Sequence, residues 1–145
     1  MKKMLFSVLA VAALAIAPAF ADDVPVSVQK LPAEAQKFLK THFSQSKVVT
    51  ALHDRDFADN DYTVILDNGV KVEFGSTGKW ESVKCRNGVV PASVVPAKVG
   101  DYVSKHYKSL GIEKIERKRY GYEVELANGL DMKFDLNGNF LGLDD

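Results

Sequence analysis

A segment of nineteen residues recurs sixty positions later in the chain, and this internal repeat most constrains the fold. The first copy runs from Tyr62 to Trp80 and the second from Tyr122 to Phe140, and seven of the nineteen pairs are identical. Upstream, the tripeptide at 31–33 returns at 95–97, and a similar apolar pattern follows each tripeptide. Repeats of this size indicate structural units that share a core. The identical residues are turn and apolar residues, so a scaffold recurs and not a set of reactive side chains.

Each copy alternates apolar and polar residues, which is typical of strands with one buried and one solvated face. Tyr122, Val124 and Leu126 point one way, and the glutamates between them point the other way. The pairs Asn68-Gly69 and Asn128-Gly129 come next and predict two-residue type I′ hairpin turns, in which both central residues have positive φ. Segments 47–53 and 112–119 supply one more strand for each copy.

A helix with a single apolar stripe is predicted before each group of strands. The spacing i, i+3, i+4, i+7, i+8 is typical of a helix that packs on a sheet. We expect Pro32 and Pro96 in the first turns, and Gly111 at the end of the second helix. The stripes consist of Ala35, Phe38, Leu39, His42 and Phe43, and of Val99, Tyr102, Val103, His106 and Tyr107.

These patterns predict an α+β fold of two tandem repeats, each with one helix and a four-stranded antiparallel meander. A unit of about 60 residues buries so little surface that it would be only marginally stable on its own. We therefore expect continuous sheets with both helices on one face, in one compact domain made of repeats 22–89 and 90–145. The first repeat has four extra residues, which we place in a longer loop at 54–61.

Residues 1–21 have the pattern of a secretory signal peptide. Lys2-Lys3 precedes an apolar run to about Ala17, and residues 18–21 end in an A-x-A cleavage site. The apolar run is short for a membrane span, which needs about 20 residues. We expect cleavage near Ala21, a periplasmic or secreted protein, and no transmembrane segment in the mature chain.

The mature chain, residues 22–145, has 17 basic and 19 acidic side chains. This balance argues against nucleic acid or anionic lipid as a partner, because both favour a strongly basic surface. The single cysteine, Cys85, cannot form an intramolecular disulfide. Its sequence neighbours favour a small buried apolar side chain over a nucleophile.

No set of residues with catalytic or metal-binding spacing is present. The acidic segment 54–61 fails the EF-hand pattern, because positions 6 and 12 hold Asp59 and Ile65. His42, His53 and His106 lack the spacing of zinc ligands. We therefore expect no catalytic residues, no metal and no cofactor.

A binding surface is instead suggested by apolar and basic residues at exposed positions. Ile65 lies between two core-facing residues and so points away from the core, where its counterpart is Glu125. Solvent-facing apolar residues are binding hot spots in many interfaces, although the other repeat could cover them. The basic run 114–119 is either a solvated strand face or a contact for an acidic partner. The candidate surface comprises Phe57, Ile65, Trp80, Arg117, Arg119 and Tyr120.

The double unit of L/V-P-A, helix, Y-x-V-x-L-x-N-G, V/L-x-V/M-x-F and G-x-W/F resembles a known family over nearly all of residues 24–145. It is similar to the PepSY-like, putative β-lactamase-inhibitor-like (BLIP-like) secreted bacterial proteins. The resemblance implies tandem helix-plus-four-strand repeats and, as in the inhibitor, a concave sheet surface that grips an enzyme. PepSY domains are associated with inhibiting or chaperoning secreted peptidases. The chain departs from the inhibitor because it lacks its disulfides, and the family supplies no catalytic residues.

The sequence thus predicts a secreted, non-catalytic, inhibitor-like protein-interaction module. The open sheet face and the edge loops 57–61 and 80–87 would contact a secreted or periplasmic protein, such as a peptidase or another envelope enzyme. One alternative is a carrier that holds a small ligand or peptide between sheet and helices, which needs a roomy apolar pocket. Another is an enzyme, which would need the three histidines to converge with carboxylates in one cleft.

Overall fold

The computed structural model describes residues 23–55 and 60–144. Its main feature is one antiparallel sheet of nine strands, in which every strand pairs with its neighbours in sequence. The strands are β1 (Asp23–Pro25), β2 (Val48–Asp54), β3 (Tyr62–Leu66), β4 (Lys71–Phe74), β5 (Trp80–Lys84), β6 (Ile112–Arg117), β7 (Gly121–Leu126), β8 (Asp131–Asp135) and β9 (Phe140–Asp144).

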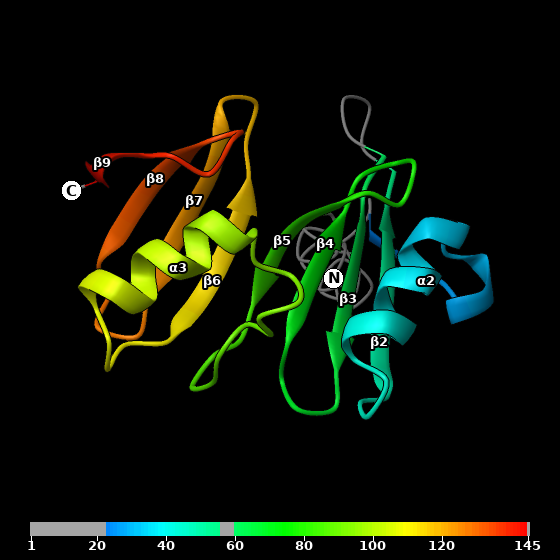
Figure 1. Cartoon of the computed structure of the whole chain (residues 1–145). Coiled ribbons are helices and arrows are strands. Elements are labelled where there is room, and N and C mark those ends of the chain that lie inside the picture. The colour runs from blue at the N-terminus through cyan, green and yellow to red at the C-terminus, as the bar shows by residue number, and fades with distance from the viewer. Residues whose placement is uncertain (1–22, 56–59, 145) are drawn as a thin grey trace, which may run out of the picture.

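Both α-helices pack on one face of this sheet and leave the other face open (Figure 1). Helix α2 (Ala33–His42) follows the short 3₁₀ helix η2 (Val28–Lys30) and precedes β2. Helix α3 (Ala97–His106) connects β5 to β6. Within the described residues, no helix is long and apolar enough to cross a membrane.

The hydrophobic core lies between the helices and the sheet. Phe74 in β4 and Phe134 in β8 are fully buried. Each meets a helix residue edge-on, Phe38 and Tyr102 respectively, with ring centroids 5.6 Å apart in both cases. The alternating residues of the strands supply the rest of this core, as the period of two predicts.

The α+β class, the continuous antiparallel sheet and the helices on one face are confirmed. Four strands follow each helix along the chain. The sheet has one more strand than the eight expected, because Asp23–Pro25 pairs with β2. The signal peptide predicted at residues 1–21 lies outside the described residues.

The hairpin turns are in the expected places but differ in type. Gly69 and Gly129 have φ of +84° and +86°, whereas Asn87 is the one non-glycine residue with positive φ in the described chain. Each turn is therefore a three-residue loop with glycine at the left-handed position, not a type I′ turn. The asparagines act through their side chains: Oδ1 of Asn68 accepts a hydrogen bond from the Val70 N–H, and Asn128 does the same for Leu130.

The helix ends also differ from the sequence prediction. Pro32 and Pro96 are the N-cap residues just outside the helices and do not lie in their first turns. Helix α3 ends before Tyr107, not at Gly111, and the Tyr107 N–H donates to the Val103 carbonyl. The Tyr107 side chain packs against the core. This packing ends the helix four residues before the glycine.

Candidate binding surface

A row of mostly charged side chains crosses the open face of the sheet, and we call it the open-face row. Strand pairing aligns one residue from each of seven consecutive strands, and most of them alternate with buried residues along their strand. The first part of the row is basic and the second part is acidic. In order from β3 to β9, the residues are Ile65, Lys71, Lys84, Lys114, Glu125, Asp131 and Asp144.

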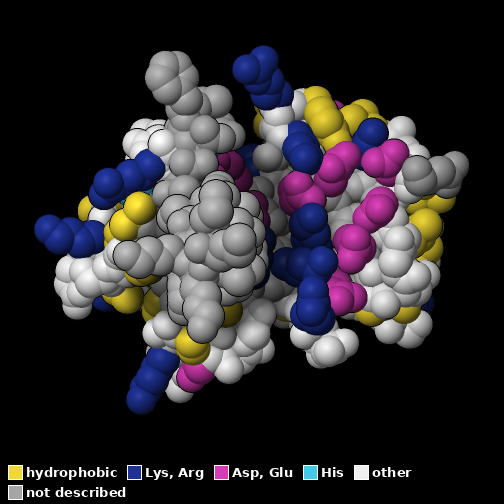
Figure 2. All heavy atoms as spheres, turned by 180° about the vertical axis from the view of Figure 1, so that it is seen from behind, with side chains coloured by type: hydrophobic (Ala, Val, Ile, Leu, Met, Phe, Trp, Pro, Cys, Tyr) yellow, Lys and Arg dark blue, Asp and Glu magenta, His cyan; other side chains and the backbone are white. Residues whose placement is uncertain are grey.

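Figure 2 shows this face of the molecule, where a band of basic side chains lies beside an arc of acidic side chains. Lys84, Glu125 and Asp131 are half-buried charges of the open-face row, and they have no ion-pair partner among residues 23–55 and 60–144.

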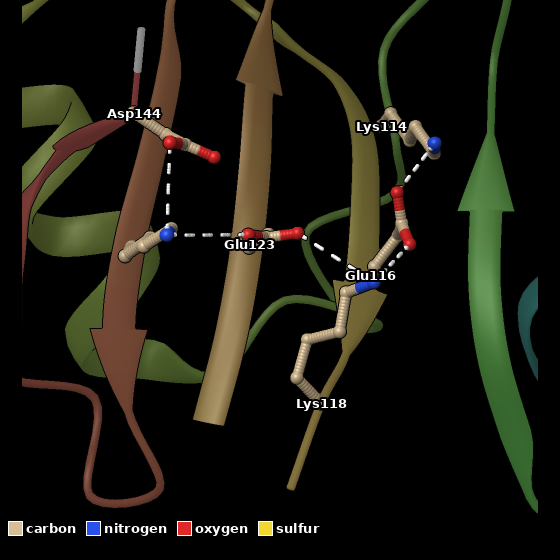
Figure 3. A network of polar contacts seen from close by, with 6 residues as sticks. Lys114, Glu116, Lys118, Glu123 and Asp144 are labelled. Atoms are coloured by element: carbon tan, nitrogen blue, oxygen red, sulfur yellow. Dashed lines mark ion pairs between the residues drawn. The ribbon is translucent and has the colours of Figure 1, made fainter. Parts of the chain in front are cut away.

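Next to the row, an ion-pair network runs over β6, β7, β8 and β9 (Figure 3). Glu116 pairs with Lys114 and, at 3.0 Å, with Lys118. Lys118 reaches Glu123 at 3.7 Å, and Lys133 joins Glu123 to Asp144 at 3.9 and 3.6 Å. The side chains are partly exposed, so each pair adds little stability alone. The network holds the charges of this face in place.

The electrostatics of the network centre on Glu116. Partial burial opposes ionisation of its carboxyl group, but hydrogen bonds and attraction from Lys114 and Lys118 prevail and lower its pKa. In turn, the hydrogen bond and charge of Glu116 raise the pKa of Lys118. Both groups are therefore charged at neutral pH.

A shallow hollow of about 130 Å³ lies in the acidic part of the face. Its lining includes Lys114 and the carboxylates of Glu116, Glu123, Glu125, Asp131 and Asp144. In the described part of the chain, no group of three or more His, Cys, Asp or Glu side chains is placed to hold a metal ion. The hollow suits basic side chains of another molecule.

Two of the residues predicted from the sequence lie on this open face. Ile65 begins the open-face row and lines an open hollow of about 450 Å³ together with Lys71, Lys84 and Arg86. Tyr120 is 41% exposed, and the Lys133 ammonium lies 5.9 Å from its ring centroid. Loss of hydration and the nearby Glu123 carboxylate raise the pKa of Tyr120 to about 12.

Trp80 and Arg117 lie on the other face, at the boundary between β5 and β6. The Trp80 ring packs against the core and lies 6.2 Å from Phe38 of α2, measured between ring centroids. The guanidinium carbon of Arg117 lies 4.4 Å from the Trp80 ring centroid. Arg119 is exposed in the turn between β6 and β7. Phe57 lies outside the described residues.

Of the six predicted residues, Ile65 and Tyr120 thus lie on the open face, and Trp80 and Arg117 lie on the other face. The segment 80–87, expected as a loop, is strand β5 as far as Lys84 and a turn after it. The open-face row was not among the residues predicted from the sequence. Alternation along each strand could have shown which charges face outward, and the hairpins could have aligned Glu125 with Asp131. The pairing of β5 with β6, which places Lys84 beside Lys114, has no local signal.

The histidines considered as zinc ligands and the cysteine considered as a nucleophile contact other parts of the fold instead of forming a reactive site. His42 Nδ1 lies 2.8 Å from Ser93 Oγ, and burial lowers its pKa. The His53 ring stacks on Tyr62 with 4.3 Å between centroids. Cys85 is a free, buried thiol, as expected, and burial together with the Glu113 carboxylate raises its pKa. None of these groups forms part of the open-face row.

Comparison with known proteins gives a family match and close structural relatives. A family model described as "Putative beta-lactamase-inhibitor-like, PepSY-like" matches residues 60–142. A "putative calcium-regulated periplasmic protein" from Bacteroides thetaiotaomicron is 44% identical, with a TM-score of 0.82 over 86% of this chain and 98% of that one. No curated protein matches the chain.

Two structures from Bacteroides vulgatus are similar to the same extent. One is a "putative periplasmic protein" of the DUF2874 family, with 42% identity and a TM-score of 0.80 over 86% of this chain and 98% of that one. The other is a "putative periplasmic protein of unknown function", with 39% identity and a TM-score of 0.80 over 85% of this chain and 99% of that one.

Proposed function

The chain belongs to the PepSY-like, putative beta-lactamase-inhibitor-like family, and from this membership we propose that it is a non-catalytic binding protein that contacts a protein partner through its open sheet face. The observation that carries the proposal is the open-face row. A face with a basic and an acidic half recognises a partner of the opposite pattern, because charge complementarity gives specificity and speeds association.

We infer that the partner is a protein of the bacterial envelope. The pattern of residues 1–21 is that of an export signal, and the relatives are described as periplasmic. The inhibitor-like family description makes an envelope enzyme, such as a peptidase, the first class of partner to test.

We also infer that the two halves of the chain are tandem repeats. Beyond the sequence identities, matching side chains make matching contacts. Phe38 lies near His42 and Tyr102 near His106, with ring centroids 4.6 and 4.2 Å apart. The open face is then a composite surface, because the basic part of the row comes mainly from the first half and the acidic part from the second.

A carrier function has less support from the structure. The space between the helices and the sheet is filled by fully buried side chains, among them Val72, Ile115 and Met132. An apolar hollow of about 340 Å³ does lie beside α3, lined in part by Val90 and Val95. It lies next to the segment that connects β5 to α3, and not in the core.

The proposal is tested by capture of envelope proteins on the immobilised chain, followed by charge reversal. Lys84→Glu with Lys114→Glu reverses the basic half, and Glu125→Lys with Asp131→Lys reverses the acidic half. The matched control is Lys37→Glu with Lys40→Glu, which changes the same number of charges on exposed positions of α2. Because one relative is described as calcium-regulated, each capture is done with calcium and with a chelator.

We expect a saturable partner whose binding falls at least tenfold with either open-face variant, which corresponds to about 1.4 kcal/mol, and stays unchanged with the control. Equal binding by all three variants would place the contact elsewhere on the chain. An absence of any saturable protein would shift support to the carrier, and binding of apolar compounds beside α3 would then be measured.

A further inference from the structure

Strands β5 and β9 occupy matching places in the sheet. Each is the last of the four strands that follow a helix. Phe74 pairs with Trp80 after a register shift, and Phe134 pairs with Phe140 after an equivalent shift. The edge of β5 that faces away from β4 therefore corresponds to the edge of β9 that faces away from β8.

These two edges differ in what covers them. Strand β6 pairs antiparallel with β5 and places Ile115 beside Val83, and both side chains are fully buried. The residue of β9 that corresponds to Val83 is Leu143, because Val83 pairs with Val72 and Leu143 with Met132. Leu143 is 52% exposed, and β9 is the last strand of the sheet. A large apolar side chain thus occupies a position that the matching edge buries.

Further apolar side chains surround this edge. Leu141 in the same strand is 57% exposed, and Leu136 in the preceding turn is 62% exposed. Native sheets protect free edges with charged side chains, above all lysine, with proline, with β-bulges or with very short strands. Strand β9 has five residues and contains neither lysine nor proline; its one charged residue is the last, Asp144, and its register shift against β8 lies between Phe140 and Gly142. The opposite edge, β1, has three residues and ends in Pro25, which has no N–H to donate.

We propose that β9 pairs antiparallel with β9 of a second copy of this chain, so that one sheet continues through a two-fold dimer. This goes beyond the proposed function, because it uses the sheet edge and leaves the open face accessible. A second copy fits because a two-fold axis perpendicular to the sheet makes the two strands antiparallel, as β5 and β6 are. The short, proline-containing β1 disfavours the alternative head-to-tail pairing.

A pairing centred on Gly142 brings leucines together. Leu141 then lies opposite Leu143 of the partner subunit, which reproduces the aliphatic contact between Val83 and Ile115. The two Asp144 carboxylates lie about 14 Å apart, four residues at about 3.4 Å each. This distance exceeds the Debye length of about 8 Å at physiological ionic strength, so their repulsion is screened.

The oligomeric state of the purified protein tests the proposal, measured by sedimentation velocity over a range of concentrations. We expect a dimer whose dissociation constant rises at least tenfold in Leu143→Lys, because a lysine on the edge opposes strand pairing. The matched control is Val49→Lys, which places the same charge at a 66% exposed aliphatic position on β2. Circular dichroism of each variant confirms that it is folded.

A second measurement locates the contact. Backbone amides of β9 should exchange hydrogen more slowly at high than at low protein concentration, and amides of β1 should not change. A protein that stays monomeric at about 100 µM, well above micromolar dissociation constants, overturns the proposal. A dimer that Leu143→Lys leaves intact, with β9 amides insensitive to concentration, also overturns it.

Discussion

The guanidinium carbon of Arg117 lies 4.4 Å from the centroid of the Trp80 ring, so this pair joins β6 to β5 on the helix-covered face of the sheet. Trp80 also stacks on Tyr122 of β7 at 6.4 Å and lies 6.2 Å from Phe38 of α2, measured between centroids. One indole ring therefore connects the first helix with three strands on both sides of the boundary between the halves.

We expect substitutions of Trp80 and Arg117 to lower the free energy of unfolding by different amounts. Trp80→Ala should lower the free energy of unfolding by about 3 kcal/mol, because it removes a large ring from the edge of the core. Arg117→Met should cost less than about 1 kcal/mol, since the cation–π contact has that order of magnitude. The change also removes a buried Nε that has no hydrogen-bond partner among residues 23–55 and 60–144. Urea unfolding followed by circular dichroism measures both, and equal losses would show that the charge of Arg117 dominates.

Substitution of a hairpin glycine should strain the backbone without causing a steric clash. A Cβ at Gly129 would meet no atom within 4 Å, but the residue has φ of +86°. Gly129→Val should therefore lower the unfolding free energy by about 1–2 kcal/mol through left-handed strain alone. Gly129→Asn should cost clearly less, because asparagine tolerates this conformation. Urea midpoints that are the same for valine and asparagine would contradict the left-handed turn, and Gly69 offers an independent repeat of the comparison.

The lowered pKa of Glu116 predicts a stability change in acid. A carboxyl group whose pKa is lower in the folded state stabilises the protein above its unfolded pKa, and this contribution is lost as the pH falls through the folded value. The ordinary value is 4.5. The wild type should therefore exceed Glu116→Gln in unfolding free energy at about pH 7, and the two should converge once the pH falls below the lowered pKa of Glu116. A difference that persists in acid would mean that Glu116 acts by packing or by neutral hydrogen bonds.

The surroundings of Cys85 predict that its thiol reacts slowly with thiol-specific reagents. Its side chain is 4% exposed, and burial and the Glu113 carboxylate raise its pKa, so little thiolate forms at neutral pH. A thiol-specific reagent should modify Cys85 at the rate of unfolding in the native protein and much faster in urea. The serine variant should be less stable than the alanine variant, because it buries a hydroxyl group at a cost of about 1–3 kcal/mol. Rapid modification of the native protein would show that the Cys85 thiol is accessible without unfolding.

Much of the fold is readable from local patterns in the chain. The alternation in Tyr122–Leu126 identifies the buried face, and Asn128-Gly129 identifies the turn that follows. These features depend on residues close in sequence, so a single chain is enough to predict them. The predicted type I′ turn was wrong because the Asn128 side chain accepts a hydrogen bond from the Leu130 N–H and so stabilises a three-residue loop.

The amino-acid sequence alone therefore determined the α+β class, the places of the helices and of most strands, and the direction in which Ile65 points. Only the tertiary structure decided that β5 pairs with β6, that Lys84 lies beside Lys114, and that Trp80 and Arg117 share the opposite face. Strand neighbours separated by a whole helix are chosen by packing over the entire core, and their register sets which charges align. The open-face row and the uncovered edge of β9 are consequences of that packing.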